Sequence, residues 1–248
     1  MTSQSSFDKP PVSPLAWGVA ALAGVIAPVA ALVLLANGSG PAPLLMVSAP
    51  ILAVGLMGAG MICAAADGRL WVGIALAAST GLGLVLLALF LGLPALSHPL
   101  SMLLVFAIAS LSFAARGALF ARSALDKGWW IAVFVVAGEA AIVLTAIARP
   151  GALPDWLLVL LPAQWATMAI QTALTGPGAL AAASALIALG GTAAVTLLVA
   201  HLWPRRWPYI VMFTTWLSLS ALVWHYPSPP PPTLESVADG DSLPSGRS

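Results

Sequence analysis

Charge is what this sequence most lacks. Charged residues make up 7% of its 248 residues, whereas a soluble domain carries about 25%. Nine Lys and Arg against eight Asp and Glu leave a net charge of +1, and no Lys/Arg-rich block occurs. These shortages argue against a soluble domain and against a nucleic-acid partner.

Cysteine and histidine are also scarce. The single cysteine, Cys63, excludes an intrachain disulfide and a Cys–Cys metal cluster. His98, His201 and His225 lie in loops or at segment ends on both sides of the expected membrane, so they predict neither a metal site nor a haem site. The motifs typical of hydrolases, metalloproteases and nucleotide-binding proteins are missing. We therefore expect no enzyme activity, no catalytic residues, no metal and no cofactor.

Apolar residues are abundant instead, at 60% of the chain, and the mean hydropathy is +1.02. Apolar stretches of about 20 residues recur, each long enough to cross a hydrocarbon core about 30 Å thick. The sequence predicts an all-α, polytopic integral membrane bundle of about eight transmembrane helices in a lipid bilayer. The expected segments are 15–36, 44–66, 70–92, 100–115, 129–148, 155–174, 179–203 and 209–225.

Small residues and the chain ends complete the expected organisation. Glycine and alanine recur at helical spacing in 44–66 and 70–92, which lets neighbouring helices approach closely. Residues 1–14 form a polar cytoplasmic tail, and 15–226 form the transmembrane domain. Residues 227–248 are proline-rich and acidic, and we expect them to be disordered because they cannot bury enough apolar surface.

The distribution of Lys and Arg predicts an orientation. The rarity of Lys beside abundant Ala, Gly and Pro favours a bacterial inner membrane, and the positive-inside rule places the N-terminus in the cytoplasm. Eight full crossings then place the C-terminus there too, but they leave Arg205 and Arg206 outside, against the rule. The alternative is that 155–174 is re-entrant and does not cross. Eight full spans are the preferred interpretation.

Glu139 is the only acidic residue inside an apolar segment. Counting from Gly128 at the helical rise puts it roughly 16 Å deep, near the bilayer midplane. If the fourth segment extends to about Arg122, Arg116 lies roughly 9 Å below the same surface by the same count, so a long guanidinium could reach the carboxylate. Glu139 is therefore a candidate proton or cation site. The alternatives are that Arg116 extends to the headgroups and that a neutral Glu139 bonds to a neighbouring helix.

The segment 155–174 carries the second candidate feature. Gln164, Thr167 and Gln171 fall on one face of a helix. Amide side chains both donate and accept hydrogen bonds, so this face could line a hydrated path or bind a polar solute. The same face could equally join helices through interhelical hydrogen bonds.

Two functions remain open at the level of the sequence. The mid-segment Glu139 and the proline-bearing helices favour a permease, or an ion- or proton-coupled transport component, for a small solute. Sparse intramembrane polarity favours a non-catalytic subunit, assembly factor or sensor that docks on other membrane proteins, or a homo-oligomer. Transport is the preferred hypothesis.

Overall fold

The computed structural model describes residues 14–39, 41–96, 98–175, 179–202 and 207–226. Over these ranges the chain is helical and contains no strand, which confirms the predicted all-α class. The predicted terminal tails, 1–14 and 227–248, lie outside the described residues except for Pro14.

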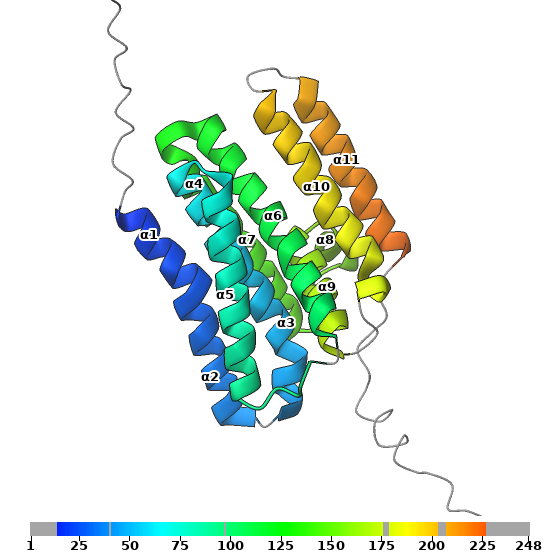
Figure 1. The fold of residues 1–248 in the computed structure, drawn as a ribbon. Helices are drawn as coiled ribbons and strands as arrows, with labels where there is room; N and C mark the ends of the chain where they lie inside the picture. Colours follow the sequence, from blue (N-terminus) through cyan, green and yellow to red (C-terminus); the bar gives the residue numbers. More distant parts are fainter. Residues whose placement is uncertain (1–13, 40, 97, 176–178, 203–206, 227–248) are drawn as a thin grey trace, which may run out of the picture.

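Seven helical rods within the described ranges are long and apolar enough to cross a membrane. Two of them contain a π-helical turn, and the other five are single α-helices (Figure 1). The first rod joins α1 (Pro14–Ala21), η1 (Leu22–Ile26) and α2 (Ala27–Ser39), and the second joins α3 (Pro41–Met57), η2 (Gly58–Ile62) and α4 (Cys63–Asp67). The others are α5 (Leu70–Phe90), α6 (Pro99–Ala124), α7 (Gly128–Ala148), α10 (Ala183–His201) and α11 (Trp207–His225), and two 3-10 turns, η3 (Leu125–Lys127) and η4 (Ala179–Ala182), precede α7 and α10.

Small residues bring η2 and α4 into close contact with α5 and α6. The sequence predicts such close approach for 44–66 and 70–92, and α6 adds Gly117 to it. A Cβ placed on Gly73 of α5 would lie 2.6 Å from the carbonyl oxygen of Gly60 and 2.6 Å from Cβ of Ala64. A Cβ on Gly117 of α6 would overlap the carbonyl oxygen of Met61. Glycine is needed at both positions because backbone, not a movable side chain, occupies the space.

The predicted crossing at 155–174 is wrong in the structure. The segment divides into a short α8 (Asp155–Val159) and α9 (Pro162–Thr175), and neither is among the helices long enough to span. Pro162 explains the break, because proline has no N–H to continue a preceding helix and suits the first position of a new one.

The direction of α10 shows that 155–174 returns to the end of the bundle from which it started. Arg122, near the end of α6, donates a hydrogen bond from Nη1 to the carbonyl of Ala200, near the end of α10. The two helices therefore run parallel, with their C-terminal ends together at the top of the view (Figure 1). Eight full crossings would make them antiparallel, so the re-entrant alternative is the one that the structure supports.

Candidate functional site

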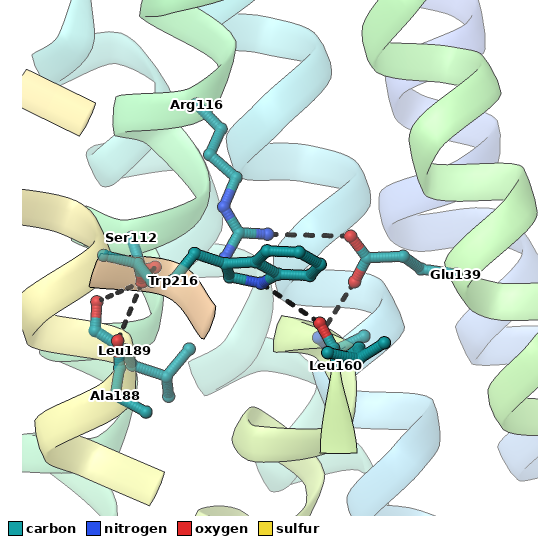
Figure 2. Close-up of polar contacts among 9 residues, drawn as sticks. Ser112, Arg116, Glu139, Leu160, Ala188, Leu189 and Trp216 are labelled. Carbon is teal, nitrogen blue, oxygen red and sulfur yellow. Dashed lines mark hydrogen bonds and ion pairs between the residues drawn. The ribbon is translucent and has the colours of Figure 1, made fainter. Parts of the chain in front are cut away.

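Arg116 of α6 and Glu139 of α7 face each other in the middle of the bundle (Figure 2). Arg116 Nη1 lies 3.6 Å from Glu139 Oε1, and the side chains are only 14% and 11% exposed. α7 runs from Gly128 to Ala148, so Glu139 is near its centre. The structure thus brings together Arg116 and Glu139, the two residues whose expected depths in the membrane predicted a contact.

The interruption between α8 and α9, called the break from here on, contacts the same carboxylate. The backbone N–H of Ala163 donates to Glu139 Oε2 at 2.9 Å. Pro162, the first residue of α9, has no N–H, and the N–H of Gln164 reaches the carbonyl of Leu161 at 3.0 Å. Glu139 therefore satisfies an amide that the start of α9 would otherwise leave unpaired, and its charge suits a helix N-terminus.

Two indoles satisfy the carbonyls on the other side of the break. Trp165 Nε1 donates to the carbonyl of Val159 at 2.7 Å, and Trp216 Nε1 of α11 donates to the carbonyl of Leu160 at 3.2 Å (Figure 2). Irregular backbone at membrane depth is tolerated only where such polar groups find partners. Hydrogen bonds with α7 on one side and with α11 on the other thus stabilise the break.

The guanidinium of Arg116 is far less well satisfied than the backbone around it. Its ion-pair distance of 3.6 Å is too long for a hydrogen bond. Nη2 is buried and has no hydrogen-bond partner among the described residues. The ring of Phe113 lies 5.7 Å from the guanidinium carbon and provides a cation–π contact. Arg116 therefore holds unused donors.

A cavity of about 290 Å³ lies beside the ion pair. Its walls come from α6, α7, α10, α11 and the break: Arg116, Leu119, Phe120, Glu139, Leu160, Leu161, Pro162, Thr192, Thr196, Met212, Phe213 and Trp216. Phe213 is 58% exposed, so the cavity reaches the outer surface of the bundle at α11. The size is at the lower limit of small-molecule pockets, which measure about 300–1,000 Å³.

The two threonines of the cavity differ. Thr192 Oγ1 donates to carbonyls of its own helix, those of Ala188 and Leu189, each at 2.9 Å, and lies 3.4 Å from Ser112 Oγ of α6. Thr196, one turn further along α10, is also buried and lines the cavity. Thr192 joins α6 to α10, and Thr196 forms part of the cavity wall.

The polar face of α9 lies apart from this cavity. Gln164, Thr167 and Gln171 are half-buried but do not line it. The Thr167 hydroxyl donates to the carbonyl of Ala163 at 2.9 Å, within its own helix. Gln171 Nε2 is buried without a hydrogen-bond partner among the described residues. Only the backbone at the start of α9 reaches the ion pair.

The sequence reasoning missed Trp216, Thr196 and Phe213. A signal for Trp216 exists, because eight of the ten tryptophans lie at predicted segment ends and the two others are Trp165 and Trp216. An indole far from the headgroups needs another partner for its N–H. Both exceptions donate to the break.

The arrangement can bind an acceptor group or a proton at one buried place. No three His, Cys, Asp or Glu side chains of the described ranges are grouped closely enough to hold a metal ion. What remains is a paired acid and base, with unused donors, beside an apolar cavity. No protein-family model, curated protein or solved structure matches the chain.

Proposed function

We propose that this protein is a membrane permease or an ion- or proton-coupled transport component for a small solute, with Arg116 and Glu139 as its polar centre. One observation carries the proposal: a buried charge pair lies at the break of a re-entrant segment and lines a cavity. Ionisable residues at membrane depth commonly mark solute and proton pathways. Discontinuous helices whose termini meet a polar site at the midplane recur in transporters.

A purely structural role accounts for less of this geometry. Replacing a buried ion pair by apolar residues is often neutral or stabilising, so such a pair is weak evidence for a stability device. A structural pair would also be expected to use its hydrogen-bond donors on the protein. Arg116 lines a cavity, and its Nη2 instead finds no hydrogen-bond partner in the part of the chain that the structure describes. Binding of a transported species accounts for both features.

The proposal includes an orientation in a bacterial inner membrane. With the N-terminus in the cytoplasm, seven crossings and a re-entrant 155–174 place Arg205 and Arg206 inside, in agreement with the positive-inside rule. The C-terminus then lies outside, which reverses the expectation from eight crossings. Reporter fusions after Gly178 should read as periplasmic and fusions after Arg206 as cytoplasmic. The opposite pair of results would restore eight full spans.

Transport is tested with purified protein in liposomes that contain a pH-sensitive dye. We expect a panel of small solutes of each charge type to include at least one that the wild-type protein moves together with protons. Glu139→Gln should abolish this flux per inserted protein, whereas Asp155→Asn, a change at an exposed carboxylate, should leave it unchanged. Silent liposomes, combined with a stoichiometric partner retained in mild detergent, would favour the docking alternative.

A further inference from the structure

One of the polar groups around the cavity lacks a hydrogen-bond partner within the described ranges. The guanidinium of Arg116 lines the cavity, and its Nη2 makes no hydrogen bond to a described residue. The carboxylate of Glu139 is the main acceptor, and Ala163 already binds one of its oxygens. The unused donor of Arg116 suits a species that accepts hydrogen bonds.

The charges restrict this species further. Arg116 and Glu139 are the charged groups that line the cavity, and together they are neutral. The other titratable groups on the elements packed against α7 do not line it: Cys63, Asp67, Arg122, Asp126 and Lys127. An anion that binds Arg116 would meet the carboxylate of Glu139. A proton on Glu139 removes this repulsion and keeps the buried site neutral, because a net charge at membrane depth is unfavourable.

We propose that the cavity binds a small organic monoanion on Arg116 together with one proton on Glu139. This substrate class rests on the proposed transport function. One anion and one proton enter together, so the loaded site holds a cationic guanidinium, a neutral carboxylic acid and the bound anion. Transport of the pair would move no net charge.

The apolar walls of the cavity indicate the chemistry of the rest of the bound anion. Phe120, Met212, Phe213 and Trp216 are among the apolar side chains that line the cavity, and they favour an apolar body over a second charge. A guanidinium suits a planar carboxylate, which it can bind through two parallel hydrogen bonds. Benzoate and decanoate fit this description, the first as a water-soluble monocarboxylate and the second as one that partitions into the bilayer.

Calorimetry on the full-length protein in detergent tests the inference. Benzoate should bind, whereas its neutral amide, benzamide, and the cation benzylamine should not. Titrations in two buffers of different ionisation enthalpy count the protons, and we expect about one proton taken up per benzoate. If decanoate binds with proton uptake and benzoate does not, the monoanion class stands and the bilayer is its source.

Variants separate anion binding by Arg116 from proton binding by Glu139. Glu139→Gln should still bind benzoate but with uptake of about zero protons, because the amide resembles the protonated acid. Benzoate should also raise the thermal midpoint of this variant more than that of the wild type, since the anion replaces the missing partner of Arg116. The double variant Arg116→Gln/Glu139→Gln strands no charge and should bind benzoate about 10- to 100-fold more weakly than Glu139→Gln. Arg149→Gln changes an exposed arginine and serves as the control.

Several results would overturn the inference. It is wrong if benzamide or benzylamine binds as well as benzoate, if proton uptake persists in Glu139→Gln, or if neither carboxylate binds and the cavity holds water only. These outcomes are independent of the liposome result. Flux of another solute without carboxylate binding would refute the monoanion and leave transport standing. Proton-linked carboxylate binding without any flux would refute transport and leave the monoanion standing.

Discussion

Arg116 and Gly117 are neighbours in α6, yet they belong to two regions built in opposite ways. Gly117 faces α4 and η2, where the backbones touch and the carbonyl of Met61 leaves no room for a Cβ. Arg116 faces α7 and the break, where a cavity of about 290 Å³ adjoins a loose ion pair. One region is filled by backbone and small side chains, and the other combines charge with space.

The difference separates what holds the bundle from what can bind a solute. Close helix packing stabilises membrane proteins through van der Waals contact and needs no polar group. Buried charge and a broken helix lower stability unless other contacts compensate for them. The dense region around α4, α5 and α6 provides a rigid support, so the neighbouring cavity, ion pair and break can be retained for a function.

The largest expected effect comes from breaking the ion pair. Glu139→Gln leaves the guanidinium of Arg116 buried without its counter-charge, which should lower the free energy of unfolding by about 3–5 kcal/mol. The loss should appear as a lower thermal midpoint in detergent and a lower abundance in the membrane.

Two controls show whether charge is the cause. Adding Arg116→Gln to Glu139→Gln should restore most of the lost stability, because no unpaired charge remains. Asp155→Asn, at an exposed carboxylate, should have no effect. A double variant as unstable as Glu139→Gln would show that the unpaired charge of Arg116 is not the cause of the lost stability.

Overpacking the dense region should have the next largest effect. In Gly117→Ala the new methyl group overlaps the carbonyl oxygen of Met61, so α6 must move away from η2, at a cost of about 1–3 kcal/mol. Gly83→Ala in α5 is the matched control, because nothing lies within 4 Å of its new Cβ. Equal thermal midpoints for the two variants would show that the close approach at Gly117 is relaxed without cost.

Much of this contrast is predictable from the sequence, and the reasons are local. Small residues at helical spacing indicate close packing wherever they occur, and a helical rise locates Glu139 and Arg116 at nearby depths. The break at Pro162 is harder to predict, because the apolar run around it also satisfies the requirements of a crossing. The choice between a break and a crossing depends on contacts between distant segments: Ala163 with Glu139, and Leu160 with Trp216.

The smallest expected effect tests how the break is held. Trp216→Phe keeps an aromatic ring in the cavity wall but removes the N–H that binds the carbonyl of Leu160 at 3.2 Å. Loss of this hydrogen bond should lower the free energy of unfolding by about 0.5–1.5 kcal/mol. Trp224→Phe, at an indole that is 50% exposed, removes the same atoms without affecting the break and should be nearly neutral. Thermal unfolding of both variants in one detergent measures the difference. Because the carbonyl of Leu160 lies beside the cavity, Trp216→Phe should also speed hydrogen exchange of the Leu161 amide next to it, and unchanged exchange would show that α11 does not hold the break.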